Sequence, residues 1–229
     1  MNKIVAVIPA RGGSKGIPKK NLKHFCGKPL IAWTIQQALK SKHIDSVWVS
    51  SDSPEILKIS KKFGANVIIR PKSLSSDTST SESAWLHALD FIEKKTNSVD
   101  TIVGLQATNP IRESSDIENA IKKFQRTGAD SLFTGSDIGN YFIWKKTNKK
   151  LTSLNYNYKK RPRRQDFTKQ FVENGSIYVL KPKILRKLNN RLGGKIEISL
   201  MENWKSFDID TLDDFKLCET LMKRYLLQK

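Results

Sequence analysis

Short apolar runs alternate with amphipathic segments along most of the chain. The first run, IVAVI at residues 4–8, is rich in β-branched residues and ends at a proline, as is typical of a buried strand. Residues 29–40 then place apolar side chains at helical spacing. The same two patterns predict further strands at residues 46–50, 66–69, 101–105, 131–134 and 176–180 and near 195–199, and further helices at 54–63, after 180 and from Thr211.

Two more helices carry a start signal. Ser79 with Glu82, and Ser115 with Glu118, have the spacing of a capping box, in which a hydroxyl and a carboxylate each accept a backbone amide of the first turn. We therefore expect a helix to begin at each serine.

The strand–helix alternation predicts an α/β fold: a Rossmann-like, mainly parallel sheet with helices on both faces, in one domain over residues 1–229. The alternation is interrupted at residues 137–173, which are polar, basic and aromatic, and we expect an inserted hairpin there that turns at 147–150. Ligands of such sheets bind beyond the carboxyl ends of the strands. Three loops that follow predicted strands should then share one edge: residues 9–28, 70–81 and 106–112.

The positive charge is concentrated in two segments. Lys and Arg outnumber Asp and Glu by 41 to 22, a net charge of +19. Residues 9–28 carry six basic residues and no acid, and residues 139–172 carry ten against the single Asp166. The rest of the chain is almost neutral, which indicates a specific anionic partner: phosphate, nucleic acid or an acidic membrane surface.

Composition excludes several classes of protein. Apolar residues make up 38% of the chain, which excludes general disorder. No apolar run approaches the roughly 20 residues of a membrane span, and the N-terminal run is too short for a signal peptide. Cys26 and Cys218 form no disulfide framework, and with three histidines there is no zinc-type spacing. We expect a soluble, cytoplasmic protein with no membrane partner.

The first loop, PARGGSKGIPKKN at residues 9–21, is a candidate phosphate site. Its three glycines allow backbone amides to approach an oxyanion closely, and Arg11, Lys15 and Lys20 add positive charge. Such neutralisation must precede attack on the α-phosphorus of a triphosphate. The loop matches neither the Walker A order nor G-x-G-x-x-G. The alternative is a plain basic turn.

Asp208 and Asp210, in SFDIDTLDDF, are a candidate metal site. If the segment is extended, a spacing of two places both carboxylates on one face, where they could hold Mg²⁺ together with substrate phosphates and water. The alternative is helix capping by Asp210 or Thr211, with Asp213 and Asp214 in the first turn. Spacing alone favours capping, although the two roles can be shared.

Gln106 and Arg112, in LQATNPIR, follow a predicted strand. Gln106 can offer an amide to a ligand hydroxyl, and the alternative is a turn in which Arg112 ties the loop down. Arg164, Gln165 and Asn174 flank the return from the insertion and by themselves indicate only a loop and a turn.

Together these segments resemble the CMP-sialic acid synthetases, the cytidylyltransferases of nine-carbon acidic (nonulosonic) sugars. The resemblance spans essentially the whole chain, and its motifs occur in the family's order: IPARGGSKGIPKKNL, RPKSLSSDTSTS, LQATNPIR, RQ, ENGSIY and FDID. It implies attack of the sugar's anomeric hydroxyl on the α-phosphorus of CTP, giving CMP-sugar and pyrophosphate, with Mg²⁺ required. It also favours the metal site over the cap for the Asp pair.

Matching positions imply a role for each site residue. CTP would be bound by Arg11, Gly13, Ser14, Lys15, Lys20, Asn21, Arg70 and Ser81, with Asn21 on the ribose. The acidic sugar would be bound by Gln106, Arg164, Gln165, Asn174 and Tyr178, with Arg164 on its carboxylate. Lys20, Asp208 and Asp210 would be catalytic, the two aspartates as Mg²⁺ ligands.

The resemblance further implies a homodimer with shared active sites. The insertion at 137–173 would be its dimerisation element, and Arg164 would serve the partner's site. The sugar stays open among N-acetylneuraminic, legionaminic and pseudaminic acids. Two alternatives remain: a nucleotidyltransferase for a neutral sugar phosphate, and a nucleic-acid-binding protein that uses the KKRPRR run at 159–164. Against nucleic acid, no recognised binding module is present and the Asp pair would have no role.

Overall fold

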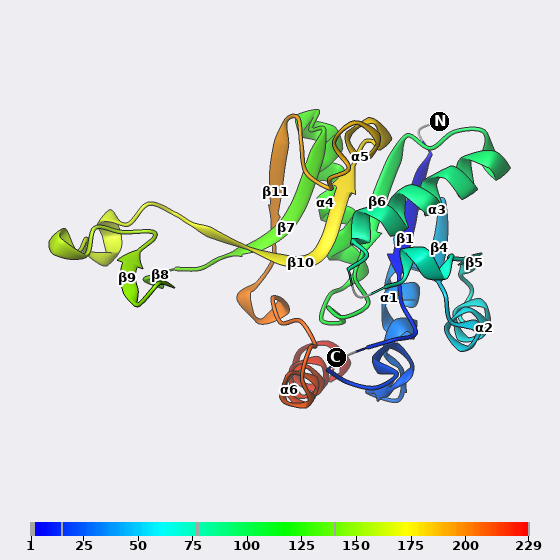
Figure 1. The fold of residues 1–229 in the computed structure, drawn as a ribbon, viewed down its shortest axis with the longest axis horizontal. Coiled ribbons are helices and arrows are strands. Elements are labelled where there is room, and N and C mark those ends of the chain that lie inside the picture. Colours follow the sequence, from blue (N-terminus) through cyan, green and yellow to red (C-terminus); the bar gives the residue numbers. More distant parts are fainter. Residues whose placement is uncertain (1–2, 15, 77, 140, 229) are drawn as a thin grey trace.

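A seven-stranded, mostly parallel sheet forms the centre of the molecule (Figure 1). The computed structural model describes residues 3–14, 16–76, 78–139 and 141–228, apart from the side chain of Arg164. From edge to edge the strands are β11 (Ile196–Leu200), β7 (Ser131–Asp137), β10 (Phe171–Leu180), β6 (Thr101–Leu105), β1 (Ile4–Pro9), β4 (Ser46–Ser51) and β5 (Asn66–Ile69). Strand β10 runs antiparallel to both of its neighbours, and the other adjacent strands pair in parallel.

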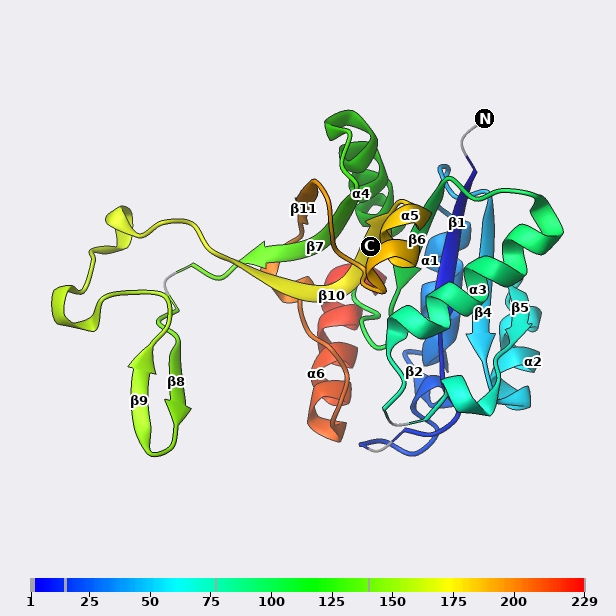
Figure 2. The ribbon, with the colours of Figure 1, turned by 45° about the horizontal axis from the view of Figure 1, so that its top comes forward.

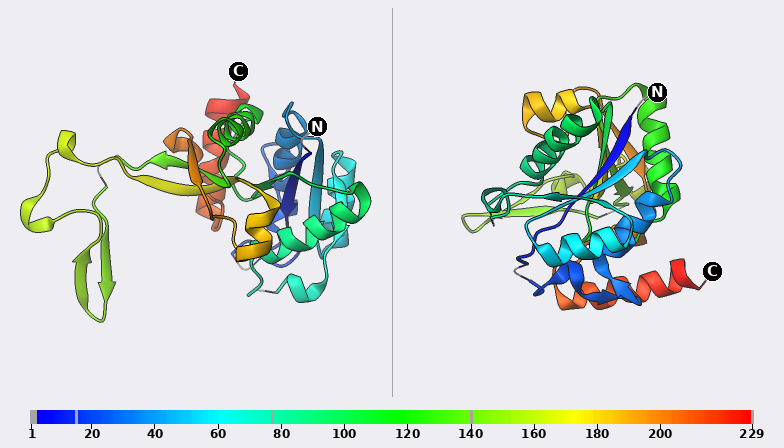
Figure 3. Two further views of the ribbon diagram at one scale, coloured as in Figure 1. Left: turned by 90° about the horizontal axis from the view of Figure 1, so that it is seen from above. Right: turned by 90° about the vertical axis from the view of Figure 1, so that its right-hand side faces the viewer.

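Helices cover both faces of this sheet (Figure 3). One face carries α1 (Leu30–Leu39), α2 (Pro54–Lys62) and α4 (Ser114–Thr127), and the other carries α3 (Ser81–Thr96) and α5 (Pro182–Leu188). The last helix, α6 (Leu212–Met222), packs against the loop after β1, where the rings of Phe25 and Phe215 meet edge-on at 5.3 Å. The predicted fold class is confirmed.

Strand β1 shows why the central strands are apolar throughout. Ala6 and Ile8 face the core shared with α1 and α4, whereas Val5 and Val7 face the core shared with α3. Successive side chains of a strand point to opposite faces, and all four residues are completely buried. A strand covered on both faces shows a continuous apolar run instead of alternation.

Short elements complete the fold. They are the strand pair β2 (His24–Phe25) and β3 (Lys28–Pro29), single turns of 3-10 helix at Lys20–Leu22, Lys72–Leu74, Tyr158–Lys160, Arg164–Asp166 and Asn203–Lys205, and a π-helical turn at Lys223–Leu227. Within the described residues, no helix combines the length and apolar character needed to cross a membrane.

The segment between β7 and β10, here termed the arm (residues 138–170), projects from the body (Figure 2). Within it, β8 (Trp144–Thr147) and β9 (Lys150–Ser153) form an antiparallel hairpin, which confirms the predicted one. Asn148 and Lys149 make its turn with positive φ angles of 46° and 67°, as a two-residue hairpin turn requires. Strands β7 and β10 are longer than predicted because they continue to pair at the root of the arm.

The start of α3 differs from the capping box predicted for Ser79 and Glu82. Thr80 is the cap: its hydroxyl accepts the amide of Ser83 at 3.2 Å. Ser79 instead contacts the hydroxyl of Ser76, at 2.8 Å, in the preceding loop. The helix therefore begins at Ser81, two residues after the predicted start, because the Ser79 hydroxyl is engaged in the loop and does not cap the helix.

The capping box of α4 is formed by Glu113 and Asp116, so the predicted pair of Ser115 and Glu118 is wrong. Glu113 has the extended backbone of a cap, with φ −113° and ψ 164°, and its amide donates to the Asp116 carboxylate at 2.7 Å. Ser115 already lies in the first turn, and Glu118 accepts the amide of Lys42. Both pairs have the required spacing, and the backbone conformation decides between them.

Candidate functional site: a cationic pocket at the strand ends

A pocket of about 380 Å³ opens at the carboxyl ends of β1, β5 and β6. The three loops that follow these strands build its wall, which confirms that they share one edge of the sheet. Nine of the predicted site residues line it: Arg11, Ser14, Lys20, Asn21, Arg70, Ser81, Gln106, Asp208 and Asp210.

Four predicted residues do not line this pocket: Gly13, Gln165, Asn174 and Tyr178. Gly13 is exposed in the first loop, and Gln165 is exposed on the arm. Asn174 and Tyr178 are buried in β10. Lys15 and the side chain of Arg164 lie outside the described residues.

The side chains of Asn174 and Tyr178 are engaged within the body. The Oδ1 atom of Asn174 accepts a hydrogen bond from the hydroxyl of Thr134 at 2.7 Å. Tyr178 packs against Trp85 with ring centroids 5.7 Å apart, and its hydroxyl donates to Glu173. Burial and the neighbouring Glu173 carboxylate raise the pKa of Tyr178. The structure thus gives both residues a packing role, and sugar binding by them stays a prediction.

The glycine-rich loop meets the acidic segment 207–210 at Lys20. The Nζ atom of Lys20 forms an ion pair with Asp210 Oδ1 at 3.0 Å and also donates to the carbonyl of Ile209. Gly16 lies so close to this segment that a Cβ atom on it would overlap the carbonyl oxygen of Asp210. This close approach of the two backbones requires a glycine at position 16, and it brings Lys20 of the same loop beside the acid pair.

Asp208 and Asp210 both line the pocket, while Ile209 between them is completely buried. The Ile209 amide donates to the carbonyl of Thr108 at 2.9 Å. The two carboxylates therefore share a face, as predicted for an extended segment. Burial and the negative charge of Asp210 raise the pKa of Asp208, whereas the Thr108 hydroxyl and Lys20 act in the opposite direction.

Helix capping uses neither of these carboxylates. Thr211 caps α6, and its amide donates to the Asp214 carboxylate at 2.7 Å in a reciprocal capping box. The capping alternative thus applies to Thr211 and Asp214. In the part of the chain that the structure describes, no group of three or more His, Cys, Asp and Glu side chains could hold a metal ion. A cation at Asp208 and Asp210 would need phosphate or water as further ligands.

Arg112 ties the loop after β6 to the body, as the alternative interpretation of that motif expected. Its side chain is 1% exposed. It donates to the carbonyl of Gln106 at 2.8 Å, the hydroxyl of Thr34 at 2.6 Å, and the carbonyl and hydroxyl of Ser176, both at 2.9 Å. Burial lowers the pKa of Arg112 to about 9. Gln106 therefore enters the pocket from a backbone that a buried cation fixes.

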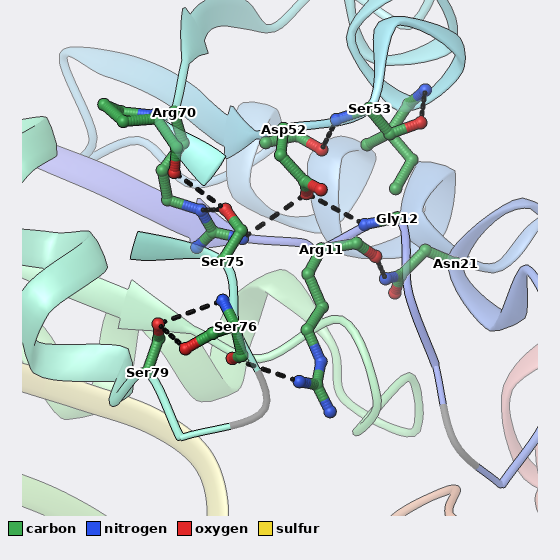
Figure 4. Close-up of polar contacts among 12 residues, drawn as sticks. Arg11, Gly12, Asn21, Asp52, Ser53, Arg70, Ser75, Ser76 and Ser79 are labelled. Carbon is green, nitrogen blue, oxygen red and sulfur yellow. Dashed lines mark hydrogen bonds and ion pairs between the residues drawn. The ribbon is translucent and has the colours of Figure 1, made fainter. Parts of the chain in front are cut away.

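Arg70 and Arg11 contact the loop of residues 70–81 in the pocket wall (Figure 4). Arg70 is 5% exposed, and its Nε donates to the Ser75 hydroxyl at 2.9 Å. Arg11 donates to the carbonyl of Ser76 at 3.3 Å, and the Ser76 amide donates to the Ser79 hydroxyl at 3.0 Å. All three serines line the pocket. Sequence reasoning missed them individually, although the serine-rich motif after the third predicted strand contains them.

Two further residues near the pocket were missed. Thr108 lines the pocket and its hydroxyl lowers the pKa of Asp208, and Asp52 accepts the amide of Gly12 at 3.0 Å. Both follow a buried strand and lie at the edge that holds the pocket. The rule that ligands bind at strand ends would have indicated them if applied to every predicted strand.

A glycine-rich cationic loop that faces two carboxylates at the strand ends of an α/β sheet is typical of proteins that bind phosphate-bearing ligands. The model of the family described as "Cytidylyltransferase" matches residues 5–229, and the chain belongs to that family. This agrees with the resemblance that the motifs show.

Two curated relatives illustrate this membership. N-acylneuraminate cytidylyltransferase A of Danio rerio is 37% identical over 226 residues, which cover 97% of this chain and 51% of that protein. Pseudaminic acid cytidylyltransferase of Campylobacter jejuni is 31% identical over 226 residues, covering 96% of this chain and 97% of that protein. The chain thus spans about half the length of the fish relative and nearly all of the bacterial one.

Solved structures share the fold. CMP:2-keto-3-deoxy-manno-octonic acid synthetase complexed with CTP aligns with a TM-score of 0.74 at 18% identity, covering 98% of this chain and 100% of that chain. The 4-diphosphocytidyl-2C-methyl-D-erythritol synthase of Anaerococcus prevotii aligns with a TM-score of 0.69 at 13% identity, covering 97% and 99%. At such identities the likeness concerns the fold alone.

Replacing Arg112 by lysine should destabilise the protein. A single ammonium group cannot reach the carbonyl of Gln106, the hydroxyl of Thr34 and Ser176 together, so buried acceptors lose their donors. We expect Arg112→Lys to lower the free energy of unfolding by about 2–4 kcal/mol in urea titrations. Arg126→Lys, at an exposed position of α4, is the matched control. Equal stability of the two variants would contradict the anchoring role.

Proposed function

We propose that this chain transfers the cytidylyl group of CTP to an acidic nine-carbon sugar of the sialic acid type. The anomeric oxygen would bond to the α-phosphorus, the bond from that phosphorus to pyrophosphate would break, and the hydroxyl proton would pass to a base. The carrying observation is that a cationic glycine-rich loop and a carboxylate pair meet at one pocket in a cytidylyltransferase-family chain. The names of the acylneuraminate and pseudaminic acid relatives support the sugar class.

Asn21 supports a nucleotide in this pocket. Its Nδ2 donates to the carbonyl of Arg11 at 3.2 Å, but its Oδ1 is buried and has no hydrogen-bond partner among the described residues. A buried acceptor without a donor is costly, and a ribose hydroxyl would supply the donor. In this proposal Arg11, Lys15 and Lys20 neutralise the phosphates. The remaining CTP contacts come from Gly13, Ser14, Arg70 and Ser81.

We also propose that Asp208 and Asp210 hold Mg²⁺. The pair fits the ion, because both carboxylates line the pocket and the charge of Asp210, together with burial, raises the pKa of Asp208. A cation bound between them would offset the repulsion between the two negative charges. Mg²⁺ commonly binds through one or two carboxylates plus substrate phosphates. When bound, it would neutralise phosphate charge. Either aspartate would take the proton of the sugar hydroxyl, and Lys20, paired with Asp210 at 3.0 Å, would remain beside the phosphates.

The arm supports a homodimer with shared sites. Large apolar side chains are exposed along it, among them Tyr141 at 75% and Leu151 at 61%, and such a surface calls for a partner. The arm projects away from its own body (Figure 2), so Arg164 and Gln165 would reach a partner's pocket. Gln106 would contact the sugar from the protomer's own body, with Asn174 and Tyr178 packed behind.

Free Cys26 and Cys218 fit a reducing, cytoplasmic location.

A substrate panel tests the proposed function. Purified protein with CTP and Mg²⁺ should release pyrophosphate when N-acetylneuraminic, legionaminic or pseudaminic acid is added, and not with CTP alone. The preferred sugar should show the highest kcat/KM. If none of the acidic sugars supports release while DNA binds with a steep salt dependence, the protein is a nucleic-acid binder and the proposal fails.

Replacing Asp210 by asparagine should reduce turnover at least 100-fold, because the metal loses an anionic ligand. The side chain is 76% exposed, so the midpoint of thermal unfolding should change little. Asp213→Asn, three residues on in the exposed first turn of α6, should keep its activity. Normal turnover of Asp210→Asn at saturating Mg²⁺ would contradict the metal role.

Shared sites predict complementation between two inactive variants. Arg164→Ala and Lys20→Ala should each be nearly inactive with the acidic sugar. After subunit exchange, half of the dimers are mixed and carry one intact site, so about a quarter of wild-type activity should return. If native mass spectrometry shows mixed dimers while activity stays absent, Arg164 does not act across the interface.

A further inference from the structure

The turn after β4, which contains Asp52 and Ser53, packs against the glycine-rich loop. The amide of Gly12 donates to Asp52 Oδ1 at 3.0 Å. A Cβ atom on Gly12 would lie 3.0 Å from the Cβ of Ser53, so the backbone of the loop is in close contact with this turn. Ser53 is itself fixed, because its amide donates to the Ser51 hydroxyl at 3.1 Å and its hydroxyl caps α2.

The same carboxylate faces the second loop of the pocket. Arg70 Nη2 lies 4.0 Å from Asp52 Oδ1, and Arg70 Nε donates to the Ser75 hydroxyl at 2.9 Å. Burial lowers the pKa of Arg70 and the charge of Arg11 adds to this effect, whereas Asp52 counteracts both. Asp52 thus stabilises a guanidinium that is 5% exposed and faces another cation.

One oxygen atom therefore connects two loops that start from different strands (Figure 4). Asp52 does not line the pocket, whereas Arg11, Arg70 and Ser75 do. Its action on a bound nucleotide would be transmitted through the backbone of Gly12 and the side chain of Arg70.

We propose that Asp52 is a positioning residue for the triphosphate nucleotide: it fixes the glycine-loop backbone and the Arg70 guanidinium in the arrangement that binds CTP. This rests on the proposed function for the identity of the nucleotide. The benefit is preorganisation, because a loop held in its binding conformation before the ligand arrives loses less freedom on binding.

The sign of the effect separates positioning from simple electrostatics. A carboxylate near an anion site repels the anion, so its removal should tighten CTP binding if charge alone mattered. Loss of positioning should weaken binding instead. Asparagine at position 52 retains an oxygen acceptor for the Gly12 amide but has no charge, whereas alanine has neither.

Titration calorimetry with CTP alone, followed by steady-state kinetics with the preferred acidic sugar, tests the proposal. For Asp52→Ala we expect the Kd and the KM for CTP to rise about tenfold, with the sugar KM within twofold of wild type. For Asp52→Asn we expect both CTP constants to stay within about threefold, since the hydrogen bond to Gly12 is retained. Glu55→Gln is the matched control: it removes a carboxylate three residues away whose partner, Lys19, is exposed like itself.

Two outcomes would overturn the proposal. One is CTP binding to Asp52→Ala that is as tight as, or tighter than, that of wild type. The other is a parallel rise of the CTP and sugar KM values with a lower midpoint of unfolding in both variants, the mark of general destabilisation. The calorimetry needs no sugar, so a wild-type protein that binds CTP but activates no acidic sugar would refute the proposed function and still test Asp52.

Discussion

The arrangement of the pocket depends on a buried guanidinium. Arg112 is 1% exposed, and its hydrogen bonds reach α1 at Thr34, the end of β6 at Gln106 and β10 at Ser176. A buried charge costs several kcal/mol unless it is hydrogen-bonded, and the bonds made by Nη1 and Nη2 of Arg112 to these elements offset that cost. The antiparallel strand β10 and the pocket loop after β6 are thereby fixed to one helix. By anchoring the loop after β6, Arg112 thus holds Gln106 in the position from which it lines the pocket.

A second buried cation fixes the chain that leads to the acid pair. Lys205 is 2% exposed and contacts Asp116 at 2.9 Å, Glu202 at 3.1 Å and Glu113 at 3.3 Å. It fixes the chain just before the segment that carries Asp208. The capping residues of α4 are therefore also the partners of this lysine. The chain that leads to the two carboxylates is thus held by a buried ion-pair cluster, and Lys20 balances the charge of Asp210 at 3.0 Å.

The charge of the chain is divided between two environments. The first cationic segment contributes Arg11 and Lys20 to the pocket wall, where Lys20 pairs with Asp210 and Arg11 contacts the Ser76 carbonyl. The second lies on the arm with its aromatic side chains packed together; Phe142 and Tyr156, for example, have ring centroids 4.1 Å apart. Much of the arm's surface stays exposed in a single chain. In the proposed function, a small anion would account for the first segment and a partner subunit for the second, a distinction that the net charge alone could not indicate.

The pattern of residues was enough to predict the strand and helix order, the shared edge of the three loops and the common face of Asp208 and Asp210. Apolar periodicity and a spacing of two are local properties of the chain, because the side chains that face the core recur at the period of the helix or strand. Tertiary structure decided the caps of α3 and α4, the contact of Gly16 with Asp210, and the burial of Asn174 and Tyr178. It also decided that Asp52 connects Gly12 to Arg70. These features depend on which distant segments meet, and residue spacing along one chain carries no information about such contacts.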